Sequence, residues 1–164
     1  MVQDISIPSK PREALPKLEP LPGAEKEANA IANILNTKAL TRKQATKTAV
    51  LEKISKAKII HLVTHVLGTD ESGVIILAPS GNDDGVLTTK EISNLKLNAE
   101  LVVLSSNNTA LGEITGDGVI GFGRAFMKAG TPSVIGSLWN VSDNSTAELM
   151  TEFYKNLLDT PTHR

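Results

Sequence analysis

The sequence predicts an α/β protein in which a mostly parallel β-sheet lies between helical layers. Strand-like and helix-like segments alternate along the chain, and this alternation is typical of such folds. The strand-like segments are rich in β-branched residues and almost continuously apolar, as strands covered on both faces should be. The chain has 164 residues, 40% of them hydrophobic, which is enough for one domain with a substantial core.

Prolines are concentrated at the start of the chain. Five of the eight prolines lie in residues 1–22, and such a density prevents regular hydrogen-bonded structure. We therefore expect an extended arm at residues 1–22, a folded domain at residues 23–159 and a short tail at residues 160–164.

Two helices are predicted before the first strand. Residues 24–35 carry apolar side chains at helical spacing, and Glu25 and Glu27 suit a helix N-terminus. Residues 43–56 repeat the helical pattern. Residues 38–40, which lie between the two helices, form at best a short strand.

The middle of the chain predicts two strands, a turn and a helix. Residues 58–64 (KIIHLVT) have the composition of a buried parallel strand, and residues 73–78 (GVIILA) lie close enough to pair with it as a short antiparallel hairpin. Residues 83–85 (DDG) predict a turn. Thr88 and Glu91 then match a capping box that starts a short helix.

The last third of the chain repeats the strand and helix alternation. Residues 100–104 predict the central strand of the sheet, and residues 119–128 predict a helix. Residues 132–138 predict the last strand. Residues 144–158 predict a final amphipathic helix with one apolar side.

The composition excludes several kinds of function. The chain has no cysteine, which rules out disulfides, thiolate metal sites and thiol chemistry by its own residues. The net charge of -1 gives no sign of a nucleic-acid or membrane partner. No apolar run is long enough for a signal peptide or a membrane span, so a cytoplasmic protein is expected.

Functional residues in a sheet of this kind gather beyond the carboxyl ends of its strands. Those ends correspond to residues 65–68, 105–109 and 139–143. His65, at the exit of the first strand, is the better functional candidate. His61 lies within the strand, and one or both histidines could be core residues whose ring nitrogens are satisfied.

Two weaker patterns do not predict a cofactor or a metal. Residues 116–121 (GDGVIG) match a dinucleotide fingerprint, and Asp143 lies at a suitable distance for a ribose-binding acid. A true fingerprint follows its strand immediately, whereas this one comes after a loop of about ten residues. His61 and His65 are four residues apart on a strand and its exit, which does not make the helical face that a metal pair needs.

Three segments taken together resemble a known family: IIHLVTHV at 59–66, LVVLSSNNTALGE at 101–113, and GDGVIGFGRAFMKAGTPSVIGSLWNVSDNSTAELMTEFY at 116–154. They are similar to the histidine motif, the nucleophile motif and the following block of CHAT domains, which are caspase- and separase-related modules often found after tetratricopeptide repeats. The likeness runs from about Leu21 to Leu158. It implies a caspase-like three-layer α/β fold and a protein or peptide partner, for example one that contains tetratricopeptide repeats.

The resemblance also implies roles for individual residues. Active members of the family use a Cys–His dyad, in which the histidine increases the thiolate fraction and backbone groups hold the oxyanion. His65 matches the base position, and Asn107 stands where the nucleophilic cysteine belongs. Asp143 matches an acid that helps to shape a pocket for a basic side chain. The remaining substrate-binding candidates are Ser105, Ser106 and Trp139.

This sequence departs from the family pattern at its most important positions. A carboxamide at Asn107 cannot be deprotonated to a useful nucleophile near neutral pH. Val66 replaces the family's glycine after His65, so we expect a β-branched side chain in a turn and an altered oxyanion region. Family members usually carry one more strand before the proline-rich segment, and a helix and strand after the last helix. We therefore expect a shortened domain whose sheet edge is covered by a partner or leaves the fold marginal.

Three functional hypotheses follow. The leading one is a catalytically inactive caspase-like domain that keeps a peptide-sized groove and binds protein partners. An alternative is a hydrolase or peptidase that uses Ser105 or Ser106 with His65 as its base, although no G-x-S-x-G elbow surrounds these serines. The third is a truncated copy without a function.

Overall fold

The computed structural model describes residues 18, 21–67, 73–81, 83–105, 116–137 and 143–159. The helices are α1 (Pro22–Ile34), the short 3-10 helix η2 (Arg42–Gln44), α2 (Lys47–Ile54), α3 (Thr89–Ser93), α4 (Gly116–Lys128) and α5 (Asp143–Asp159). The strands are β1 (Ile59–Val63), β2 (Val66–Leu67), β3 (Val74–Ile76), β4 (Val86–Thr88), β5 (Leu101–Ser105) and β6 (Val134–Gly136). Within the described ranges, no helix combines the length and apolar character needed to cross a membrane.

The larger sheet is parallel and has the strand order β1-β5-β6. Its β1 and β5 pair in register from Ile59 opposite Leu101 to Val63 opposite Ser105. The segment predicted as the central strand does occupy the centre, because β5 also pairs with β6. Its residues are the most deeply buried of the sheet, as the near-continuous apolar composition predicts.

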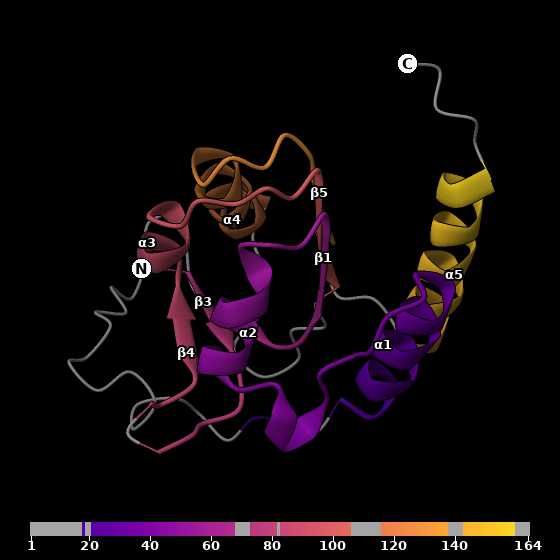
Figure 1. Cartoon of the computed structure of the whole chain (residues 1–164), viewed down its shortest axis with the longest axis horizontal. Coiled ribbons are helices and arrows are strands. Elements are labelled where there is room, and N and C mark those ends of the chain that lie inside the picture. The colour runs from indigo at the N-terminus through magenta and orange to yellow at the C-terminus, as the bar shows by residue number, and fades with distance from the viewer. Residues whose placement is uncertain are drawn as a thin grey trace.

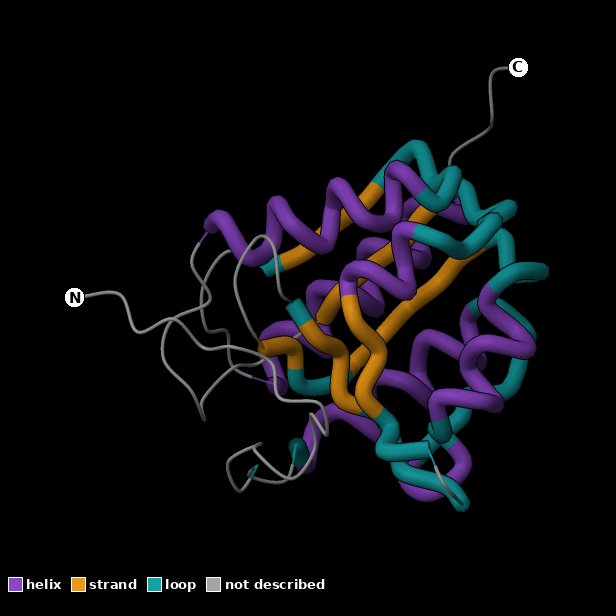
Figure 2. The backbone as a smooth tube through the Cα atoms, turned by 90° about the vertical axis from the view of Figure 1, so that its left-hand side faces the viewer, coloured by secondary structure: helices purple, strands orange, loops and turns teal. Residues whose placement is uncertain are grey.

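Helices cover both faces of this sheet, which confirms the three-layer arrangement. On one face, Val103 of β5 packs with Ile31 of α1 and Tyr154 of α5. On the opposite face, Val102 packs in a larger core with Phe126 of α4 and with residues of α2 and α3. Figure 1 shows β1 and β5 between these two helical layers, and Figure 2 shows the strands in orange and the helices in purple from the side of α3 and β4.

The antiparallel part of the fold is a separate sheet with the order β2-β3-β4. The expected hairpin partner of β3 was the segment that forms β1, but β3 pairs with β2 and with β4. The sequence prediction missed β4 because it has only three residues and runs directly into the next helix. Thr88 ends β4 and is also the N-cap of α3.

Local sequence signals in this region are confirmed. Thr88 accepts a hydrogen bond from the Glu91 amide at 3.1 Å, and the Glu91 carboxylate accepts one from the Thr88 amide at 2.9 Å. This is the predicted capping box. The predicted turn is present as well, with the Asp83 carboxylate accepting from the amide of Gly85, which has a φ of 74°.

The second predicted helix begins later than the sequence pattern indicates. Residues 42–44 form η2, and α2 starts only after Thr46, whose hydroxyl accepts from the Ala49 amide at 3.1 Å. A capping threonine therefore sets the start of α2. Residues 38–40 form no strand.

Candidate functional site

The carboxyl ends of β1 and β5 lie side by side, because Val63 is the pairing partner of Ser105. His65 follows Val63 by two residues, and Asn107 follows Ser105 by two residues. The structure describes His65, which is buried with 7% of its surface exposed. Asn107 lies outside the described residues.

The backbone around His65 is held by the smaller sheet. The carbonyl of His65 accepts a hydrogen bond from the Ile76 amide at 3.0 Å. The neighbouring Thr64 hydroxyl donates to the Ile76 carbonyl. Strand β3 therefore fixes the corner at which the chain leaves the parallel sheet.

The residue after His65 is not in a turn, which corrects the expectation for Val66. Val66 opens β2, pairs with Ile75 and is buried with 8% of its surface exposed. It belongs to the larger hydrophobic core. The physical reason is the side chain itself, since a β-branched apolar residue favours an extended, buried position over a turn.

The structure describes the other candidate residues only in part. Ser105 is the last residue of β5 and is buried with 5% of its surface exposed. It lies on the same face as Val103, beneath the layer of α1 and α5, because side chains alternate along a strand. Asp143 is the first residue of α5, and its side chain is outside the description. The candidates outside the described residues are Ser106, Asn107 and Trp139.

A buried polar cluster joins three elements on the α1 and α5 side of the sheet. Nε2 of His61 lies 3.0 Å from a carboxylate oxygen of Glu27, and Nδ1 lies 3.1 Å from the hydroxyl of Tyr154. The side chains of Glu27 and His61 are 2% and 7% exposed, and Tyr154 is fully buried. The rings of His61 and Tyr154 meet edge to face.

One arrangement of protons satisfies every group in this cluster. An ionised Glu27 only accepts hydrogen bonds, so Nε2 of His61 carries the proton that points to it. Nδ1 of the neutral ring then accepts from the Tyr154 hydroxyl. Burial, assisted by the negative charge of Glu27, raises the pKa of Tyr154 and keeps the phenol protonated.

Sequence reasoning identified only part of this cluster. The possibility that His61 is a satisfied core histidine is confirmed. The sequence pattern places both Glu25 and Glu27 at a helix N-terminus, but only Glu25 lies in the first turn of α1. The available signal was spacing, because Glu27 precedes the core residue Ile31 by four positions and so shares its helical face.

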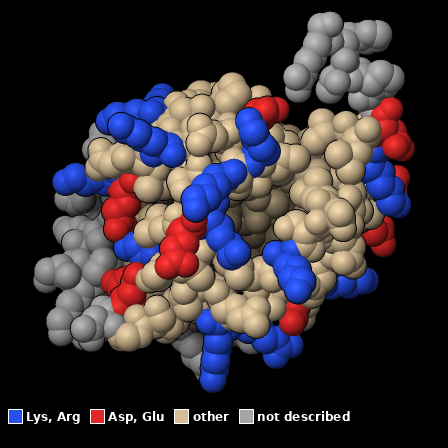
Figure 3. Space-filling view, viewed as in Figure 1, with Lys and Arg blue, Asp and Glu red and all other residues tan. Residues whose placement is uncertain are grey.

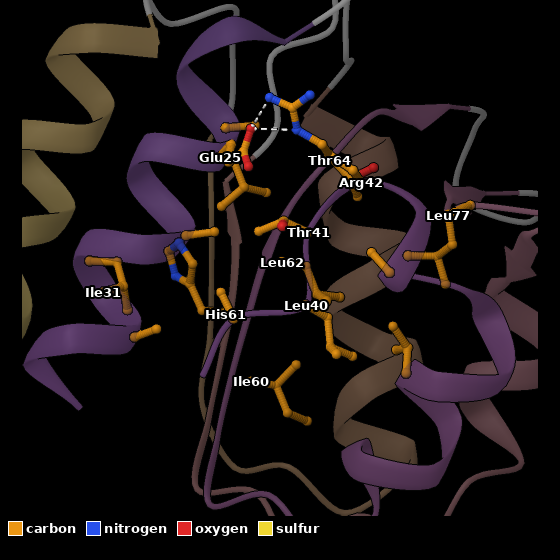
Figure 4. Close-up of a pocket in the computed structure, with 18 of the residues that line it drawn as sticks. Glu25, Ile31, Leu40, Thr41, Arg42, Ile60, His61, Leu62, Thr64 and Leu77 are labelled. Atoms are coloured by element: carbon orange, nitrogen blue, oxygen red, sulfur yellow. Dashed lines mark hydrogen bonds and ion pairs between the residues drawn. The ribbon is translucent and has the colours of Figure 1, made fainter. Parts of the chain in front are cut away.

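A groove of about 900 Å³ runs along the outer edge of β1. Its walls come from α1, from α2 and from the segment at residues 37–42, and every residue from Ile59 to His65 lines it. Figure 3 shows the hollow with Lys and Arg side chains on its rim. Figure 4 shows the ion pair of Glu25 and Arg42 near Thr64 at one end of the groove, and Ile60 at the other end.

Comparison with known proteins gives a family and two relatives. The sequence profile of the CHAT domain family matches residues 5–164. Tetratricopeptide repeat protein 28 of Mus musculus is 28% identical over 178 residues, and that of Homo sapiens is 29% identical over the same length. Each match covers 85% of this chain and 7% of the relative, so the chain spans a small part of these proteins.

Proposed function

This chain belongs to the CHAT domain family, and on that premise we propose that it is a catalytically inactive, caspase-like domain that binds a protein or peptide without cleaving it. The observation that carries the proposal is the absence of cysteine from the whole sequence. A CHAT peptidase needs a thiolate as its nucleophile, and the residue at the matching position is Asn107. A carboxamide at that position has no proton that a histidine can remove near neutral pH.

Our proposal assigns His65 to the base position of the family's Cys–His dyad. His65 follows β1 by the same two residues by which Asn107 follows β5, and the two strands are paired in register at their ends. This equal spacing supports the assignment of His65 and Asn107 to the base and nucleophile positions. With Asn107 in place of a thiol, the role that we propose for His65 is that of a polar group beside a bound peptide.

The other residues of the proposed peptide site come at or just after the ends of β5 and β6 in the sequence. Asp143 is the first residue of α5, and its carboxylate would attract a basic side chain of the bound peptide. Ser105 is buried beneath the helices, which favours a supporting role over direct contact. Ser106 and Trp139 complete the proposed contacts.

The names of the two relatives support a protein as the binding partner. Both are named for tetratricopeptide repeats, and such repeats stack into solenoids with extended binding surfaces. We propose that this domain acts in the cytoplasm beside or against such a repeat protein.

The deciding experiment compares the natural chain with Asn107→Cys on a library of fluorogenic peptides, including peptides with Arg or Lys at the cleavage position. The natural chain should cleave none of them, and Asn107→Cys should cleave a subset if the base and peptide site are intact. The control is Asn107→Cys combined with His65→Ala, which should be inactive. Turnover by the natural chain that is lost in His65→Ala would refute the proposal.

A serine hydrolase is the alternative to test in parallel. A fluorophosphonate probe labels a serine only when a base activates it. Labelling of Ser105 or Ser106 in the natural chain, lost in His65→Ala, would favour this alternative. The burial of Ser105 argues against that residue as the nucleophile.

A further inference from the structure

We infer that the outer edge of β1 is a second binding site, which takes an extended apolar strand with acidic ends from a partner protein. The site is the groove between α1 and α2, which runs along the length of β1 and meets the proposed peptide site at His65. The inference does not require any role for Asn107 or Asp143, so it can fail or succeed independently of the proposed function.

The apolar side chains of β1 are incompletely covered for a strand in a three-layer fold. Ile59, Leu62 and Val63 are only half-buried, although helices lie on both faces of the sheet. Val102, Val103 and Leu104 of the neighbouring β5 are buried. The difference comes from the outer edge of β1, where no described strand pairs with it.

Backbone geometry identifies the groups that face this edge. The amide of Val102 donates to the Ser133 carbonyl on the β6 side. Backbone groups alternate between the two sides of a strand, so Leu101, Val103 and Ser105 face β1. In the observed register their partners on β1 are Ile60 and Leu62.

The remaining β1 residues point their backbone groups the other way. By the same alternation, Ile59, His61 and Val63 direct their amide and carbonyl groups into the groove. An exposed row of this kind is a template for an added strand. It offers three amides and three carbonyls to a partner.

The groove walls set the character of the added strand. Ile31 and Ala28 of α1 line one side, and Val50 and Ile54 of α2 line the other. Because both faces of an added strand would meet apolar walls, it should be continuously apolar and not alternating. Matching the five residues of β1 requires about five residues, which span about 17 Å.

The charges of the groove favour acidic ends on that strand. Among the described residues, the groove lining includes the cations Lys38, Arg42 and Lys53 but a single carboxylate, Glu25. Glu25 is paired with Arg42 at 2.7 Å. Lys38 and Lys53 are exposed and are left to attract a negative group.

The test uses the full chain and a synthetic peptide with five valine and isoleucine residues between pairs of aspartates. Amide hydrogen exchange followed by NMR should slow at Ile59, His61 and Val63 by tenfold or more when the peptide is added. The amides of Ile60 and Leu62 already face β5, so they should change little and serve as an internal control. A peptide with a central proline should not give this protection, since proline removes a strand donor.

Charge variants test the acidic ends. Lys38→Glu combined with Lys53→Glu should weaken peptide binding about tenfold at low salt and less at high salt. Lys90→Glu on α3, an exposed lysine outside the groove, is the matched control and should bind as the natural chain does. The same peptide with lysine ends should bind more weakly than the acidic one.

Three results would overturn the inference. If the acidic peptide does not protect the amides of Ile59, His61 and Val63, the proposed site is refuted. Slow exchange of these amides in the dilute chain alone would mean that another part of the same chain covers the edge. Protection that rises with protein concentration, together with dimers in analytical ultracentrifugation, would assign the edge to a second copy.

Discussion

His61 and Glu27 are joined by a 3.0 Å contact between ring nitrogen and carboxylate that lies almost completely out of water. The contact ties β1 to α1, and the Tyr154 hydroxyl on the other ring nitrogen ties both to α5. A buried charge without its partner is costly, whereas a fully satisfied network helps to specify one packing arrangement. We therefore assign this cluster to the positioning of the helical layer and not to catalysis.

Glu27→Ala should destabilise the fold by about 2–3 kcal/mol, because it leaves the Nε2 proton of His61 buried without an acceptor. The measurement is urea unfolding followed by circular dichroism. Glu25→Ala is the matched control on the same helix, since Glu25 forms an exposed ion pair with Arg42, and it should change stability little. Equal effects of the two substitutions would contradict the role given to Glu27.

The phenol of Tyr154 should ionise only above its ordinary pKa of 10.0, because burial and the charge of Glu27 favour the protonated form. A pKa that is raised in the folded state adds stability that is fully present below pH 10 and is lost as the pH rises further. Tyr154 is the single tyrosine of the chain, so tyrosinate absorbance reports this group alone. That absorbance should appear together with unfolding.

Tyr154→Phe supplies the control for this pH dependence. It should cost about 1 kcal/mol at neutral pH, since Nδ1 of His61 loses its donor while the ring packing remains. Its stability should then fall less steeply above pH 10 than that of the natural chain. Ordinary tyrosine ionisation in the folded protein would show that the hydroxyl is accessible to water.

Val66→Gly should destabilise the domain by about 2–3 kcal/mol, although the glycine matches the family pattern. The substitution removes a buried side chain from β2 and adds backbone freedom to the unfolded chain. Thermal melting of Val66→Gly and Val66→Ala separates the two contributions, with the alanine variant less affected. For this reason activity restoration should begin with Asn107→Cys alone.

Gly85→Ala should destabilise the fold more than Gly81→Ala, although both glycines have positive φ angles. A Cβ at Gly85 would lie 2.4 Å from the Leu77 carbonyl oxygen, whereas one at Gly81 would meet nothing within 4 Å. Gly81→Ala should therefore cost about 1 kcal/mol for its conformation alone. Urea midpoints measure both, and equal losses would show that the turn relaxes to avoid the contact.

The elements predicted most accurately are those with strong local signals. The capping box at Thr88 and Glu91, the turn ending at Gly85 and the central β5 were all predictable from composition and spacing. β2 and β4 were missed, since strands of two and three residues carry too little periodicity. Their pairing with β3 depends on partners distant in sequence.

The candidate site, like the fold, was predictable from the sequence only in part. Motif spacing placed His65 at the end of a parallel strand beside β5, and the register of β1 and β5 agrees with that position. It did not predict that Val66 would continue into a buried strand. Nor did it predict that His61 would be paired with Glu27 and Tyr154, which lie 34 and 93 residues away in the sequence.

By itself, the sequence determined the alternation of strands and helices, the local caps and turns, and the absence of a thiol nucleophile, because these depend on residue type and short-range spacing. Tertiary structure decided which polar groups are buried together and which strand edge faces a groove. Burial and pairing at β1 arise from contacts among α1, α2, α5 and β5, and no local pattern encodes how these elements meet.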